Sequence, residues 1–336
     1  MYGPTKLLTK LELTGTTGTQ KVEFFPVECK QDVTVWLLDT PGFDDTNRTD
    51  SEVLKEISAH LADPKILYEN RKSKLDGIIY LHRITDQRMG GTAQTNLFTF
   101  QKLCGQKALT NVILATTMWE RVSEQEGIER EEELKRTEHF WGGMIGHGST
   151  VLRHMNTPES ALSIIEHFIK IDRPQERPKM VLALQEELVD QELTLDQTGA
   201  GQEVDHGLTK AHNGFKARLD ELQEHLASAQ ELHDEELAAA VMKQRTQLEV
   251  EMQQMIQQQK DLNVTVQELY EEKLAGMQQK LEYMEKNPRV RSHPARESFG
   301  RWHVSMSLFG ATYWFNSLNN NLRWALVVSS SWRIIR

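Results

Sequence analysis

The stretch Val33-Thr-Val-Trp-Leu-Leu-Asp39-Thr-Pro-Gly42-Phe-Asp-Asp-Thr46 decides the fold that we predict for this chain. Residues 33–38 form a short apolar run typical of a buried strand, although periodicity alone does not exclude a helix. Asp39 stands at the carboxyl end of that strand, followed by a Pro-Gly turn. Nucleotide hydrolases use a carboxylate here to hold Mg²⁺, and a glycine to let a backbone N–H approach the γ-phosphate. The alternative is an ordinary turn, because Asp, Pro and Gly are common turn residues.

Further strands and helices are expected to alternate over residues 1–171. The expected strands are 21–27, 33–38, 75–81, 111–116 and 150–153, and the expected helices are 51–61, capped by Asp50, 93–104, 124–144 and 159–170. The first two strands predict a hairpin, and the later alternation predicts a parallel α/β sheet. Polar residues follow the carboxyl ends of several strands, where such sheets bind their ligands.

Bulk composition narrows the class of protein. The chain has 336 residues, a net charge of −10 and a mean hydropathy of −0.54, which favours two domains with a long polar helical segment. The acidic balance argues against a nucleic-acid partner. Two cysteines, Cys29 and Cys104, make no disulfide framework and fit a reducing compartment. We see no secretory leader and no apolar run of about 20 residues, and therefore expect a cytoplasmic protein.

Residues 172–206 are expected to form a linker with a short helix, and residues 207–287 a coiled coil. The evidence is an apolar seam with alternating spacings of four and three, which is typical of coiled coils. Its first members are Phe215, Leu219, Leu222 and Leu226. The seam is kept again from Leu262 on, but the register slips between Leu226 and Leu262, where the seam becomes Met- and Gln-rich around residues 252–259. Such a slip indicates a stutter or a hinge. We predict self-association into a homo-oligomer through this seam; the alternative is a solvated helix that folds back on the globular domain.

Residues 288–336 differ abruptly in composition and are expected to form an irregular tail. They hold four of the seven tryptophans, and no acidic residue follows Glu297. Aromatic and basic residues together are compatible with an interfacial membrane segment. A non-native extension from a misread gene boundary is an equally good account of this composition.

Several motifs, taken in order, resemble one family of proteins. Residues 39–46 resemble the DxxG box of septin-like and immunity-associated P-loop GTPases. Residues 79–91, 115–120 and 153–157 are similar to the fungal "G domain-containing proteins". The resemblance covers residues 10 to 170. It implies an α/β fold, namely a P-loop NTPase sheet flanked by helices, with GTP and Mg²⁺ as ligands and a coiled coil behind.

The resemblance also implies residue roles on the phosphate side. Thr19 matches the switch threonine that reaches magnesium, and Asp39 matches the aspartate on the metal side. Gly42 matches the glycine that contacts the γ-phosphate. Phe43 stands where Ras-like enzymes carry a glutamine that orients water, so we expect slow hydrolysis or dependence on a partner.

On the base side, residues 117–120 lie where other GTPases carry Asn/Thr-Lys-x-Asp. Thr117 and Glu120 are the matching positions, and the Glu120 carboxylate would accept two hydrogen bonds from guanine. Asn156 and Thr157 match the loop near the base. Met118 replaces the usual lysine, which leaves an ATPase as a weaker alternative.

The phosphate-binding motif of the family, Gly-x-x-x-x-Gly-Lys-Ser/Thr, occurs nowhere in the chain. We therefore expect a G domain over residues 1–171 that lacks its first strand and P-loop, and weak nucleotide binding. The alternative function is a degenerate G-domain scaffold, or interaction protein, that binds no nucleotide.

Overall fold

The computed structural model describes residues 21–29, 33–43, 48–63, 68–69, 72–73, 75–86, 90–169, 180–286 and 322–329. Its centre is a sheet of six strands in the order β1-β2-β8-β5-β6-β7, of which β1 alone runs antiparallel to its neighbour. The strands are β1 (Glu23–Glu28), β2 (Thr34–Asp39), β5 (Gly77–Arg83), β6 (Val112–Thr117), β7 (Thr150–Arg153) and β8 (Leu322–Ser329). Two short strands, β3 (Tyr68–Glu69) and β4 (Lys72–Ser73), pair separately. The predicted α/β class, parallel sheet and β1–β2 hairpin are confirmed.

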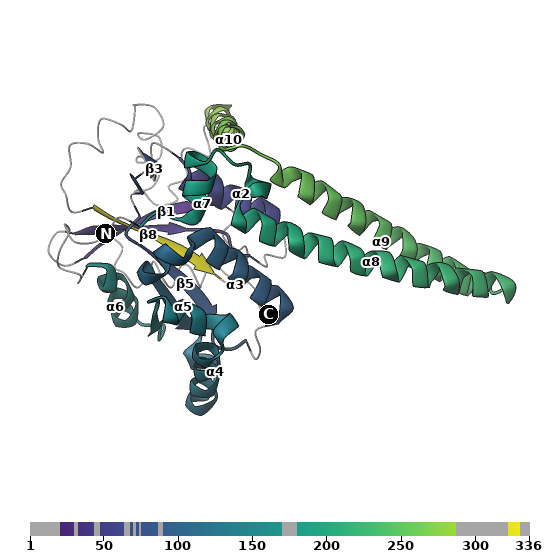
Figure 1. Cartoon of the computed structure of the whole chain (residues 1–336), viewed down its shortest axis with the longest axis horizontal. Coiled ribbons are helices and arrows are strands. Elements are labelled where there is room, and N and C mark those ends of the chain that lie inside the picture. The colour runs from purple at the N-terminus through teal and green to yellow at the C-terminus, as the bar shows by residue number, and fades with distance from the viewer. Residues whose placement is uncertain are drawn as a thin grey trace.

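Helices cover both faces of the sheet (Figure 1). They are α2 (Asp50–Leu61), α3 (Gly91–Cys104), α4 (Glu124–Arg136), α5 (Gly143–Gly146), α6 (Pro158–Ile169) and α7 (Ala183–Gln185). α6 covers one face, where Ile164 and Phe168 pack on strand residues such as Leu37 and Ile113. Gly77 is required there, because a Cβ atom would lie 1.9 Å from the Phe168 ring. The opposite face carries the larger core beneath α2 and α3.

Two helix boundaries differ from the sequence prediction. Thr49, and not Asp50, caps α2: its hydroxyl accepts from the Glu52 N–H at 3.2 Å, and the Glu52 carboxylate accepts from the Thr49 N–H at 2.9 Å. This reciprocal pair is a capping box. The predicted helix over 124–144 ends at Arg136, because Thr137 has an extended backbone (φ −80°, ψ 115°), and the chain kinks again at Phe140, whose backbone is non-helical.

β8 is the largest departure from the predicted fold. The C-terminal strand lies in the middle of the sheet, parallel to both neighbours, with Thr34 opposite Leu322 on one side and Gly77 opposite Ala325 on the other (Figure 1). Residues 322–329 therefore are not part of an irregular tail, and that prediction is wrong for this segment. The remaining residues of the expected tail lie outside the described part of the chain.

The helical region contains three helices where a coiled coil interrupted by a stutter or a hinge was expected over residues 207–287. They are α8 (Gly199–Glu231), α9 (Glu235–Leu262) and α10 (Val266–Lys286). α8 and α9 run side by side in opposite directions and project from the α/β part as a hairpin (Figure 1). The Gln259 amide of α9 donates to Asp205 at 2.9 Å and to Thr209 at 3.0 Å, both near the start of α8.

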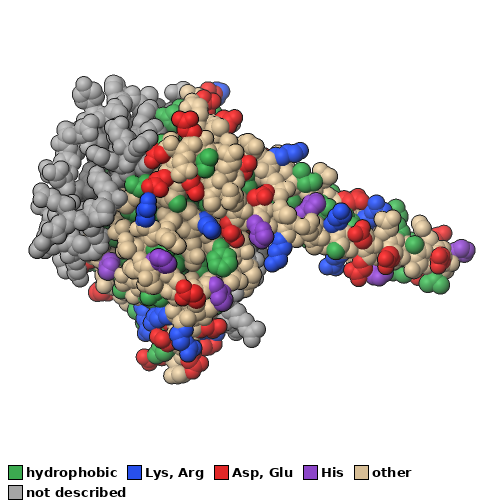
Figure 2. Space-filling view, viewed as in Figure 1, with side chains coloured by type: hydrophobic (Ala, Val, Ile, Leu, Met, Phe, Trp, Pro, Cys, Tyr) green, Lys and Arg blue, Asp and Glu red, His purple; other side chains and the backbone are tan. Residues whose placement is uncertain are grey.

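The hairpin turns at His233, which has a left-handed backbone (φ 53°), and Asp234 caps α9 by accepting from the Leu237 N–H at 2.9 Å. The slip in the apolar register thus contains a chain reversal. Leu222 of the predicted seam is buried inside the single chain. Acidic and basic side chains alternate over the outer surface of the hairpin (Figure 2).

The base of the hairpin belongs to the main core. Leu195, Ala200 and Val204 are buried there, although residues 172–206 were predicted to be a linker with a short helix. Gln185 is fully buried, and its side-chain amide donates to the Leu61 carbonyl at the end of α2 at 2.8 Å. Packing therefore continues without a break from the sheet into the helical region.

Candidate functional site

The turn that follows β2 is the first part of the candidate site. Asp39 is the last residue of β2, and its side chain is buried at the carboxyl edge of the sheet. Gly42 is buried three residues beyond the strand, and Phe43 is 1% exposed within the larger core. Phe43 therefore anchors this turn by packing, which a water-orienting glutamine would not do.

The loop after β6 is the second part. Thr117 is buried at the end of the strand, and Met118 has a left-handed backbone (φ 64°). A short 3-10 turn, Trp119–Arg121, follows. Trp119 is buried, whereas the Glu120 side chain is 45% exposed and its carboxylate lies 3.7 Å from the Arg121 guanidinium. The loop thus presents one accessible carboxylate beside a buried anchor.

The loop after β7 lies next to the loop after β6. His154 is buried, and its backbone N–H donates to the Thr116 carbonyl of β6 at 2.8 Å. Burial holds the pKa of His154 below its usual value, and the negative charge of Glu120 opposes that shift. Asn156 follows with a left-handed backbone (φ 54°), which places it at a sharp turn. The structure therefore brings the β6 and β7 loops together at one edge.

Thr157 already has a structural role. Its hydroxyl accepts from the Ser160 N–H at 3.2 Å, and so caps α6. This cap weakens the case for Thr157 as a ligand contact, although its backbone still lies in the β7 loop.

The two groups of candidates lie at the same edge but on different strands. Asp39 and Gly42 follow β2, whereas Thr117 and Glu120 follow β6. β8 and β5 separate β2 from β6, which at the usual strand spacing places the two strand ends about 14 Å apart. An elongated ligand with unlike ends fits that separation better than a compact one does.

Thr19, the other predicted metal-side residue, lies outside the described residues. Within the described ranges, no group of three or more His, Cys, Asp or Glu residues is placed to hold a metal ion. Mg²⁺ in nucleotide sites takes one or two protein oxygens and completes its shell with phosphate and water. The hard oxygens of the Asp39 carboxylate fit that requirement as one protein ligand.

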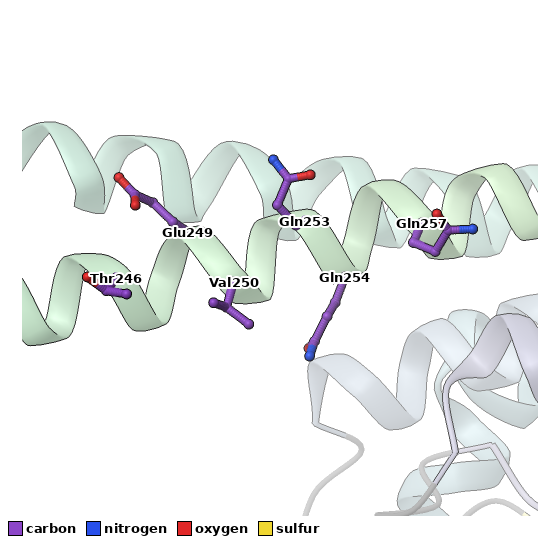
Figure 3. Close-up of a pocket in the computed structure, with 6 residues that line it drawn as sticks. All are labelled: Thr246, Glu249, Val250, Gln253, Gln254 and Gln257. Atoms are coloured by element: carbon purple, nitrogen blue, oxygen red, sulfur yellow. The ribbon is translucent and has the colours of Figure 1, made fainter.

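A hollow of about 590 Å³ lies elsewhere, on the hairpin. All six lining residues come from α9, as Figure 3 shows. They are Thr246, Glu249, Val250, Gln253, Gln254 and Gln257. Glu249 pairs with Arg245 at 3.0 Å, as in an ordinary exposed helix pair. An open surface formed by one helix holds no converging polar groups, so this hollow is a poor candidate for a ligand site.

Sequence reasoning missed two residues that support the β6 and β7 loops. Arg153 ends β7, and its guanidinium contacts the buried carboxylate of Glu131 on α4 at 2.6 Å. Glu131 lies in a run of charged residues that is typical of a solvated helix face. The signal that could have identified it is the 3.6-residue period, since Gly127, Glu131 and Leu134 share the buried face of α4.

No model of a known protein family matches the chain, and no curated protein matches it. Among the described helices, none combines the length and the apolar character needed to cross a membrane.

Proposed function

We propose that the carboxyl edge of this sheet binds a guanine nucleotide with Mg²⁺. In this proposal Asp39 and Gly42 lie on the phosphate and metal side, and Glu120 with the β7 loop lies on the base side. The observation that carries the proposal is that the β6 and β7 loops converge near the exposed Glu120. The buried Asp39 lies at the same edge of the sheet, at the end of β2. Parallel sheets bind ligands at this edge.

The strand order supports the proposal further. An antiparallel edge strand followed by five parallel strands is the order of a G domain, and here β8 takes the central position. This arrangement favours a P-loop NTPase-like sheet whose middle strand comes from the C-terminal end of the chain. Because Phe43 is committed to the core, we further propose that any hydrolysis is slow or needs a group from a partner.

A scaffold that binds no nucleotide is the second candidate. The observation that favours it is the absence of Gly-x-x-x-x-Gly-Lys-Ser/Thr from the sequence, since that motif supplies much of the phosphate affinity in P-loop proteins. The hairpin would then be the functional surface. Self-assembly through the helical region stays a prediction; it would use outward-facing side chains such as Leu237, Met242 and Val250, which remain exposed.

Glu120→Ala tests the base side. We expect at least about a tenfold loss of GTP affinity, because the two guanine donors lose their acceptor, and little change for ATP, which has no such pair. Ligand-observed NMR competition between GTP and ATP on the full chain measures both affinities, including weak ones.

Glu129→Ala is the matched control. Glu129 is an exposed glutamate on α4 whose carboxylate accepts from Gln125 within its own helix, so its loss should leave the preference for GTP unchanged. If Glu120→Ala weakens GTP and ATP equally, Glu120 supports the loop and does not read the base.

A further inference from the structure

A buried carboxylate joins three elements beneath the base side of the proposed site. The Glu131 side chain on α4 is 2% exposed. Its oxygens accept from Arg153 Nε at 3.0 Å and Nη2 at 2.6 Å, and from Lys135 Nζ at 2.9 Å. The Thr116 hydroxyl at the end of β6 donates to the same carboxylate at 3.3 Å. One acid on α4 therefore holds the ends of both β6 and β7.

The same cluster holds the Trp119 ring. The indole N–H donates to the Thr116 hydroxyl at 3.0 Å, and the Arg153 guanidinium lies over the ring with its Cζ atom 4.2 Å from the ring centroid. Gly127 of α4 packs against the ring as well, since a Cβ atom there would lie 2.6 Å from it. Trp119 is thus fixed by a hydrogen bond, a cation–π contact and close packing.

The charges in this cluster compensate one another. Burial alone would raise the pKa of Glu131, but hydrogen bonds from Arg153 and Lys135 outweigh it and hold the pKa below its usual value. The carboxylate therefore stays ionised. A planar guanidinium that is both forked onto a carboxylate and stacked on an indole is an arrangement that lysine cannot reproduce.

Resting on the proposed function, we infer that Arg153 and Glu131 are positioning residues, which fix Trp119 and so set the specificity of the next residue, Glu120, for guanine. Within the described ranges, Glu120 has only weak support of its own, because its side chain is 45% exposed and its ion pair with Arg121 is long, at 3.7 Å. Reading two adjacent donors requires a carboxylate whose backbone is held still. The cluster also ties in β7, whose loop carries the remaining base-side candidates.

Arg153→Ala in the full chain tests this inference, with Arg153→Lys as the conservative variant. Arg245→Ala is the matched control, because Arg245 also pairs with a glutamate but lies on the exposed hairpin. Two quantities are measured: the ratio of GTP to ATP affinity by competition, and the ¹⁹F NMR line of Trp119 in protein labelled with 5-fluorotryptophan, assigned from Trp119→Phe.

We expect Arg153→Ala to shift the Trp119 line and to weaken GTP by about tenfold while ATP changes by less than about twofold. Arg153→Lys keeps the charge but loses the fork and the stack, so we expect an intermediate loss of about threefold for GTP. Arg245→Ala should change neither quantity. If Arg153→Ala does not fold, the ratio of GTP to ATP affinity in Arg153→Lys tests the inference instead.

The outcomes separate this inference from the proposed function. If the wild type prefers GTP, and Arg153→Ala moves the Trp119 line but keeps the preference, the cluster only stabilises the fold and the inference is overturned. An equal loss for both nucleotides overturns it too. If the wild type binds neither nucleotide, the proposed function itself fails and the inference falls with it.

Discussion

A chain that ends at residue 321 is expected to lose the cooperative unfolding transition of its α/β part. β8 pairs with six positions of β2 and five of β5. Its removal leaves the facing edges of β2 and β5 without partners in the middle of the sheet. Buried backbone groups without partners are costly, and the two halves of the sheet would share no ladder. Thermal unfolding followed by circular dichroism measures the loss, and amide hydrogen exchange over 34–39 and 77–81 locates it.

A chain that ends at residue 329 is the control, because it keeps β8 whole. We expect this shorter deletion to retain the transition and the slow exchange of β2 and β5. If the chain ending at 321 melts like the full chain, β8 is not a strand of the sheet in solution. The strand order proposed for nucleotide binding would then lose its central member.

Lys273→Ala is expected to cost about 3–5 kcal/mol of unfolding free energy, because it leaves a buried carboxylate without its cation. Lys273 on α10 and Asp63, just after α2, meet at 2.8 Å with side chains only 9% and 5% exposed. Burial lowers the pKa of His60 to about 4, and the positive charge of the same ammonium is the second cause of that shift. Urea unfolding followed by fluorescence and circular dichroism gives the free energy.

Glu272→Ala is the control for this pair. Its carboxylate lies 3.2 Å from Lys55 across the same two helices but is 67% exposed, so its loss should cost only about 0–1 kcal/mol. Equal costs for the two variants would show that α10 does not bury Lys273 against α2 in solution. The comparison matters for function because α2 begins shortly after the Asp39–Phe43 turn.

Local patterns in the sequence predicted most of the strands but not the order of the sheet. Continuous apolar runs identified β2, β5 and β6 because each is buried on both faces. Residues 322–329 have the same apolar character, yet their partners lie more than 240 residues earlier in the chain, and no local signal carries that pairing. The abrupt change of composition after residue 288 favoured a tail instead.

The helical region shows a related limit. An apolar seam through Leu219 and Leu222 has the same spacing whether the facing helix belongs to a second chain or to the same one. The reversal depends on His233 and Asp234. Histidine and aspartate also occur within ordinary helices, so these residue types do not mark a turn. At the candidate site, the position of Glu120 just after a strand was predictable from the sequence. Arg153 and Glu131 were not, because the contact joins a strand end to a helix 22 residues away.

The most direct test of nucleotide binding is calorimetric titration of the full chain with GTP, in Mg²⁺ and in EDTA, with ATP as comparison. We predict saturable binding that requires Mg²⁺, is weaker than about 1 µM because the P-loop motif is absent, and favours GTP over ATP by about tenfold or more. Failure to saturate at millimolar GTP in Mg²⁺, or equal affinity for ATP, would contradict the account.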